Sequence, residues 1–173
     1  MQSSAAHHVL VTRSAEETRE LGRHLGGCLL AGGFVALTGD LGSGKTVLVQ
    51  GIAEGLGCTG DVSSPSFVIV NQYRGRVPIY HVDLYRVTDP RSLEDLGYRE
   101  FFYGDGVALV EWADRVPDLL PADRLDVSLE LVAADERRIT IAARGALHAA
   151  ALRAALSRGR RVEGTEGRAD THD

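Results

Sequence analysis

One eight-residue segment, residues 39–46, constrains the fold of this chain more than any other, and it reads Gly-Asp-Leu-Gly-Ser-Gly-Lys-Thr. It follows a short apolar run at residues 34–38, which is typical of a strand buried on both faces. It precedes a pattern at residues 45–56 that predicts a helix ended by Gly57. A strand, a loop of the form G-x-x-x-x-G-K-[ST] and a helix, in that order, make a P-loop. The segment therefore predicts an α/β fold.

The same segment predicts a site for the phosphates of a nucleotide. Its glycines allow backbone angles closed to other residues, so that successive N–H groups converge on phosphate oxygens, and the helix N-terminus adds partial positive charge there. Lys45 is the only lysine among 19 basic residues. Its compact ammonium is predicted to reach the β- and γ-phosphates, and the Thr46 hydroxyl is predicted to bind Mg²⁺. The predicted nucleotide-binding residues of the loop are Gly39, Asp40, Leu41, Gly42, Ser43, Gly44, Lys45 and Thr46.

A P-loop also needs an acidic side chain for the magnesium ion, commonly at the end of an apolar strand. Two residues meet this condition. Asp83 ends the apolar run 77–82, and Glu111 ends the run 107–110. Either carboxylate is a candidate to bind Mg²⁺, directly or through water, and the other to orient or activate the attacking water. Lys45, Asp83 and Glu111 are therefore the catalytic candidates, and Thr46, Asp83 and Glu111 the metal-binding candidates.

The remaining pattern predicts one domain around this unit. Helices are expected at 15–31, 89–96 and 146–156, a further strand at 107–110, and antiparallel hairpins at 66–73 with 77–83 and at 125–132 with 138–142. Together they predict a single P-loop NTPase-like α/β domain with a mixed central sheet flanked by helices. The domain is expected to span residues 9–157. Residues 1–8 are expected to form a flexible N-terminus, and the charge-rich residues 158–173 a disordered tail.

Composition excludes several other classes of protein. Hydrophobic residues make up 44% of the 173, enough to build a core. The least charged stretch, residues 25–38, is interrupted by glycines and too short to span a membrane, and no basic leader precedes it. A net charge of −5 argues against a nucleic-acid binder that relies on its own basic surface. Cys28 and Cys58 have no metal-ligand spacing, so we expect reduced thiols and a cytoplasmic location.

Four sequence blocks, in order, resemble the TsaE (YjeE) family of small bacterial ATPases in tRNA threonylcarbamoyladenosine biosynthesis. The blocks are residues 39–46, Val-Ser-Ser-Pro-Ser-Phe at 62–67, His-Val-Asp-Leu-Tyr-Arg at 81–86, and Val-Glu-Trp at 110–112. The third block is the most specific, because generic P-loop proteins do not have it after a Ser-Pro segment. Together with the start at Ser14, the resemblance covers about residues 10–145.

The resemblance implies a Mg²⁺-dependent ATPase that is slow without its partners, TsaB-like and TsaD-like proteins. In that family TsaD transfers a threonylcarbamoyl group to adenosine 37 of tRNAs that read ANN codons, so this chain would meet tRNA only indirectly, and no membrane. By motif position, Glu111 resembles the magnesium ligand, Asp83 a second acidic catalytic group and Trp112 a neighbour of the nucleotide. Ser66 stands where the family usually has threonine, in a segment that resembles a switch loop, and by this resemblance it is a further candidate to bind the nucleotide.

Other interpretations of the same residues stay open at this point. A small P-loop kinase has a similar length, although no arginine-rich lid is evident, and a nucleotide-gated binding module would need the same loop without hydrolysis. His81 is predicted to lie on the same strand face as Asp83, either as a base or as a structural hydrogen-bonding group. Arg86 is a candidate for phosphate or partner contacts, and Arg137 or Arg138 a candidate neighbour of the nucleotide.

Overall fold

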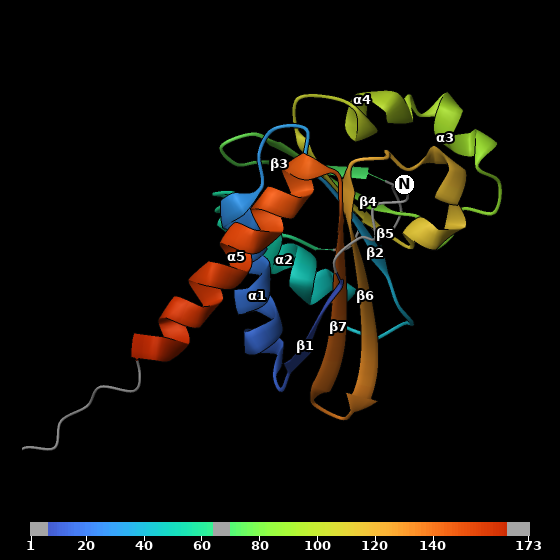
Figure 1. Cartoon of the computed structure of the whole chain (residues 1–173). Helices are drawn as coiled ribbons and strands as arrows, with labels where there is room; N and C mark the ends of the chain where they lie inside the picture. Colours follow the sequence, from blue (N-terminus) through green and yellow to red (C-terminus); the bar gives the residue numbers. More distant parts are fainter. Residues whose placement is uncertain (1–6, 64–69, 166–173) are drawn as a thin grey trace, which may run out of the picture.

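A mixed β-sheet runs through the centre of the molecule, with helices on both of its faces (Figure 1). This computed structural model describes residues 7–63 and 70–165. The strands are β1 (His7–Thr12), β2 (Phe34–Thr38), β3 (Val70–Arg74), β4 (Pro78–Asp83), β5 (Val107–Glu111), β6 (Arg124–Ala133) and β7 (Glu136–Arg144). The helices are α1 (Ala15–Cys28), α2 (Lys45–Gly55), α3 (Arg91–Asp95), α4 (Tyr98–Phe102) and α5 (Ala146–Thr165), with short 3₁₀ turns at Ala113–Arg115 and Pro117–Leu119.

The strand order across the sheet is β1-β7-β6-β2-β5-β4-β3. β2 pairs in parallel with β5 on one side and with β6 on the other, and β4 pairs in parallel with β5. The remaining pairs, β1 with β7, β3 with β4 and β6 with β7, are antiparallel. The predicted mixed sheet with antiparallel hairpins is therefore confirmed, and the strand that precedes the glycine-rich loop lies at its centre.

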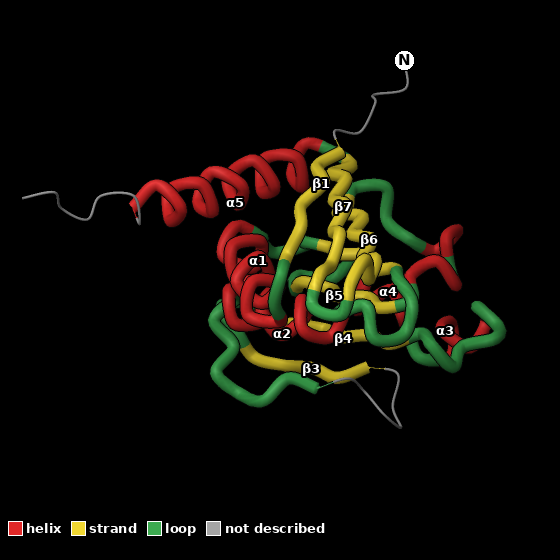
Figure 2. The backbone as a smooth tube through the Cα atoms, turned by 90° about the horizontal axis from the view of Figure 1, so that it is seen from below, coloured by secondary structure: helices red, strands yellow, loops and turns green. Residues whose placement is uncertain are grey.

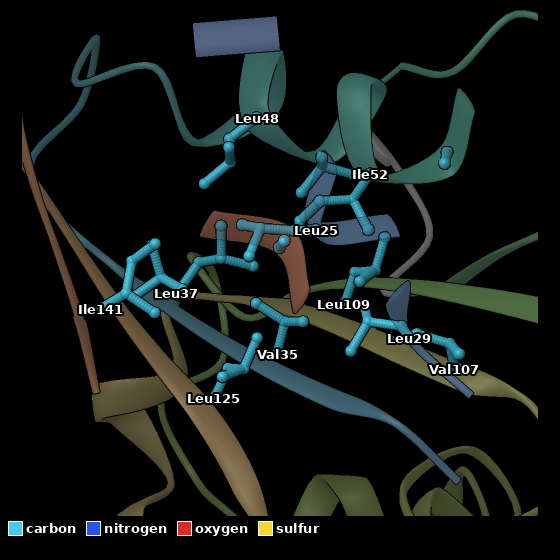
Figure 3. Packing of buried hydrophobic residues seen from close by; sticks show 14 of the residues in the cluster. Leu25, Leu29, Val35, Leu37, Leu48, Ile52, Val107, Leu109, Leu125 and Ile141 are labelled. Atoms are coloured by element: carbon cyan, nitrogen blue, oxygen red, sulfur yellow. The ribbon is translucent and has the colours of Figure 1, made fainter. Parts of the chain in front are cut away.

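Alternate residues of the central strands enter two separate hydrophobic clusters, because successive side chains of a strand point to opposite faces. Val35 and Leu37 of β2 pack with Leu109 of β5 on the face covered by α1, α2 and α5 (Figure 3). Phe34 and Ala36 pack on the other face, which α3 and α4 cover (Figure 2). Burial on both faces explains why residues 34–38 form a continuous apolar run rather than an alternating one.

Helix α1 packs unusually closely against α2, and glycines at the contact make this possible. A Cβ atom at Gly26 would lie 2.1 Å from the carbonyl oxygen of Ile52, and one at Gly51 would lie 2.1 Å from that of Arg19. The start of α1 is capped by Ser14, whose side chain accepts a hydrogen bond from the Glu17 N–H at 3.0 Å. This close packing fixes the position of α2, which begins with Lys45.

The ends of the domain differ from the sequence-based expectation. His7 and His8, predicted to be flexible, pair with Ala142 and Ile141 of β7 as the first residues of β1. Helix α5 continues to Thr165, beyond residue 157, where the domain was expected to end. The helix lies close to α1 here, since a Cβ atom at Gly159 would lie 3.5 Å from His24 Nδ1 and one at Gly27 would lie 2.6 Å from Arg158 Nη1. Residues 1–6 and 166–173 lie outside the described part of the chain.

Other differences are local. The helix predicted at 89–96 is limited to α3, and α4 and the two 3₁₀ turns were not predicted, because such short elements have weak periodicity. The hairpin strand predicted at 66–73 is described only from Val70, since residues 64–69 lie outside the described ranges. None of the helices in the described ranges is both long and apolar enough to cross a lipid bilayer.

Candidate functional site

The glycine-rich loop joins β2 to α2 and is built from backbone conformations that favour glycine. Gly39, Gly42 and Gly44 have φ values of +142°, +76° and +100°. Gly44 is the N-cap of α2 and makes no side-chain capping hydrogen bond. The first N–H groups of α2 therefore face the loop without a capping side chain, as an anion-binding helix N-terminus requires.

Lys45 folds back over this loop with its ammonium almost buried, since only 5% of the residue is exposed. Its Nζ donates hydrogen bonds to the carbonyl oxygens of Gly39 at 2.5 Å and Asp40 at 2.8 Å, and to Ser43 Oγ at 3.3 Å. Burial lowers the pKa of the ammonium, while the nearby carboxylates of Glu111 and Asp83 oppose this change. All three acceptors are neutral, so a phosphate oxygen would be a stronger partner for this cation.

The two candidate acids lie side by side at the ends of adjacent strands. Asp83 of β4 is the register partner of Glu111 of β5, and each directly follows a valine, Val82 or Val110, of the cluster on the face that α3 and α4 cover. Glu111 is only 3% exposed, and the Thr46 hydroxyl donates to its Oε1 at 3.3 Å. Asp83 Oδ1 accepts a hydrogen bond from the Tyr85 N–H at 3.0 Å. Burial raises the pKa of Asp83, and the neighbouring Glu111 adds to this rise.

His81 lies on the same face of β4 as Asp83, as predicted, and is fully buried. Its Nε2 is 2.5 Å from Oε2 of Glu111. The two carboxylate oxygens of Glu111 thus have different neighbours, with His81 beside Oε2 and Thr46 beside Oε1. The structure therefore gives His81 a hydrogen-bonding position behind Glu111.

An aromatic pair forms one wall of the site. Trp112 directly follows β5 in a left-handed conformation with φ +58°, which is uncommon for a large side chain. This turn brings its ring to 4.3 Å from Lys45 Nζ, measured at the ring centroid, and to 5.0 Å from the Tyr85 ring. The Arg115 guanidinium lies 5.6 Å from the Trp112 ring. The indole therefore packs against the Lys45 ammonium at one side of the site.

Most of these groups line one cavity of about 350 Å³. Its lining residues are Leu41, Gly42, Ser43, Gly44, Lys45, Thr46, Val47, Asp83, Tyr85, Glu111, Trp112 and Arg137. Of the predicted residues, Gly39 and Asp40 do not line it but hold Lys45 through their carbonyl groups. Ser66 lies outside the described residues, so its predicted contact with the nucleotide stays a prediction.

Two residues that line the cavity, Tyr85 and Arg137, were not among the predicted catalytic, nucleotide-binding or metal-binding residues. Tyr85 lies two residues after Asp83 in the block at 81–86. The spacing of this block alone does not show which of its side chains point into the cavity. Arg137 enters from β7, the strand beyond β6, and its Nη2 lies 3.5 Å from the Gly42 carbonyl oxygen. Arg138 instead pairs with Glu130 at 3.2 Å on the exposed hairpin. Of the two arginines considered from the sequence, Arg137 is therefore the one at the site.

The oxygen atoms gathered here fit a magnesium ion. Mg²⁺ prefers hard oxygen ligands and is commonly bound through one or two carboxylates together with substrate phosphates. The Thr46 hydroxyl and Glu111 Oε1 are already neighbours, and Asp83 lies on the adjacent strand end. The side chains of Thr46, Asp83 and Glu111 offer oxygen atoms as ligands, so they suit Mg²⁺ better than a softer metal.

A central parallel strand, a G-x-x-x-x-G-K-T loop and two strand-end acids define the class of P-loop α/β proteins. Residues 12–139 match the family model described as "Threonylcarbamoyl adenosine biosynthesis protein TsaE". The chain belongs to this family, which acts in the formation of threonylcarbamoyladenosine in tRNA.

Individual relatives agree with this assignment. The chain is 44% identical over 135 residues to the tRNA threonylcarbamoyladenosine biosynthesis protein TsaE of Bacillus subtilis, a match that covers 78% of this chain and 84% of that protein. It is 40% identical over 132 residues to the corresponding protein of Treponema pallidum, with coverage of 76% and 98%. The crystal structure of Bacillus subtilis YdiB superposes with a TM-score of 0.77 at 33% identity, over 91% of this chain and 99% of that one.

Proposed function

We propose that this protein binds ATP with Mg²⁺ in the cavity between the loop and the strand ends, and hydrolyses it. The observation that carries the proposal is the convergence of Lys45, Thr46, Asp83 and Glu111 on one cavity of about 350 Å³. Phosphoryl transfer is catalysed chiefly by positioning and by stabilisation of negative charge. A cation, a hydroxyl and two carboxylates at one helix N-terminus supply both.

Each residue has a distinct task in this proposal. Lys45 and the N–H groups at the start of α2 bind the phosphate oxygens, and Thr46 and Glu111 hold the magnesium ion. When bound, Mg²⁺ would neutralise charge on the phosphates. Asp83 orients the attacking water and accepts its proton. The raised pKa of Asp83 supports this division, because a general base works best when its pKa approaches the working pH.

We further propose that the hydrolysis serves threonylcarbamoyladenosine formation at position 37 of tRNAs that read ANN codons, in a cytoplasmic assembly with TsaB-like and TsaD-like proteins. The family to which the chain belongs supports the pathway. The net charge of −5 supports an indirect relation to tRNA, because a protein that holds tRNA through its own surface is commonly basic.

The activity is tested by phosphate release from ATP with and without Mg²⁺, alone and with the two partner proteins added. We expect slow Mg²⁺-dependent release that the partners accelerate. Glu111→Ala is expected to lose turnover more than nucleotide affinity, since Glu111 holds the metal and Lys45 the phosphates. Transfer of the γ-phosphate to an acceptor would favour a kinase, and tight binding without turnover under any condition would favour a nucleotide-gated module.

The biological role is tested separately by deleting the gene and measuring modified nucleosides in bulk tRNA by mass spectrometry. The proposal predicts loss of threonylcarbamoyladenosine, restored by the wild-type gene and not by a Lys45→Ala copy. Unchanged nucleoside levels in the deletion strain would reject it.

A further inference from the structure

His81 is a fully buried polar side chain whose purpose the proposed hydrolysis does not by itself explain. It lies on β4 two residues before Asp83 and opposite Leu109 of β5, so it is diagonal to Glu111 across the strand pair. Its Nε2 lies 2.5 Å from Glu111 Oε2. A diagonal pair of this kind is within reach only because β4 and β5 keep one register along this stretch.

Within the described ranges, only one of the two ring nitrogens of His81 has a hydrogen-bond partner. A carboxylate only accepts hydrogen bonds, so Nε2–H is the donor and Glu111 Oε2 the acceptor. Within the described ranges, Nδ1 is buried and has no hydrogen-bond partner. An apolar side chain would fill this position without burying an unpaired nitrogen, which costs free energy. The contact with Glu111 is therefore the one hydrogen bond that the His81 ring makes in the part of the chain that the structure describes.

The hydrogen bond from His81 restricts the orientation of the Glu111 carboxylate. The terminal torsion of a glutamate is soft, so its oxygens are not fixed by rotamer preference alone. Here Oε2 accepts from His81 while Oε1 lies 3.3 Å from the Thr46 hydroxyl. The bond at Oε2 keeps Oε1 turned toward Thr46, the other proposed magnesium ligand. Hydrogen bonds behind metal ligands commonly change metal affinity by about 10- to 100-fold.

We propose that His81 is a positioning residue that holds Glu111 Oε1 toward the metal, without itself touching the nucleotide or the ion. The inference rests on the proposed function, since it assumes that Glu111 binds Mg²⁺. The hydrogen bonds described for Lys45 go to the loop rather than to His81. Loss of the His81 bond should therefore weaken metal binding and leave metal-free nucleotide binding largely unchanged.

The test compares His81→Gln with His81→Asn. Both replace the ring by a carboxamide, but the glutamine nitrogen can occupy nearly the position of Nε2, whereas the asparagine is one methylene too short. Binding of Mn²⁺, as a probe for Mg²⁺, is measured by titration in the presence of a non-hydrolysable ATP analogue. Nucleotide affinity without metal and the melting temperature are measured in parallel.

We expect His81→Asn to weaken Mn²⁺ binding about tenfold, and His81→Gln to remain within about threefold of the wild type. Metal-free nucleotide affinity should stay within about twofold in both. Equal Mn²⁺ affinity in the two variants, or an equal loss of metal and nucleotide binding, would overturn the positioning role. A wild-type protein that binds neither nucleotide nor Mn²⁺ would instead reject the proposed function, so the two failures are distinguishable.

Discussion

Replacing Gly51 by alanine should separate α1 from α2 and destabilise the fold. The new Cβ would lie 2.1 Å from the Arg19 carbonyl oxygen, far inside van der Waals contact, and the nearby atoms are backbone atoms that cannot rotate away. Overpacking of this kind costs up to about 3 kcal/mol. The higher helix propensity of alanine stabilises α2 by about 1 kcal/mol and offsets part of this cost. The net loss is therefore about 2 kcal/mol of unfolding free energy.

For a chain of this size, that loss lowers the melting temperature by roughly 4–8 °C. Denaturant and thermal unfolding, followed by circular dichroism, measure both quantities. Gly27→Ala is the matched control, because that helical glycine faces only the movable end of the Arg158 side chain. We expect the control to be neutral or up to about 1 kcal/mol more stable. If Gly51→Ala proves as stable as Gly27→Ala, the close packing of α1 on α2 does not determine the stability of this fold.

Three further predictions concern charged groups. Lys45→Ala should abolish ATP hydrolysis while the far-ultraviolet circular dichroism spectrum stays unchanged; near-wild-type phosphate release would contradict the assignment. Arg137→Ala should weaken nucleotide binding roughly fivefold, about 1 kcal/mol, while Arg138→Ala changes it little; equal effects of the two would place Arg137 outside the site. The Arg19 hydrogen bond lowers the pKa of Glu54 below 4.5. As the pH falls below about 4.5, Glu54 therefore takes up a proton in the unfolded chain before it does so in the folded chain, and this favours unfolding. Glu54→Gln removes this effect and should reduce the loss of stability on acidification. An unchanged dependence of stability on pH would count against this ion pair.

The strand, glycine-rich loop and helix at the site could be predicted from the sequence because their pattern is local. The residues 39–46 lie in one segment, and their spacing already requires a strand before them and a helix after them. Asp83 and Glu111 could be singled out because each ends an apolar strand, where a P-loop protein commonly has its acidic residue. Their pairing as register partners is seen only in the structure.

The other contacts depend on pairing between distant segments, which local patterns do not determine. Arg137 reaches the loop because the β6–β7 hairpin lies beside β2, so its approach to Gly42 follows from the strand order. The contact of His81 with Glu111 needs the register of β4 against β5. The extension of α5 to Thr165 was missed because composition predicted disorder, while packing against α1 supports the helix.

Isothermal titration of the purified protein with ATP and Mg²⁺ measures whether the loop after β2 binds the phosphates of a nucleotide. We expect saturable binding at one site per chain, competed by ADP and lost in Lys45→Ala. The absence of binding to ATP, ADP, GTP or GDP with Mg²⁺ present would contradict it.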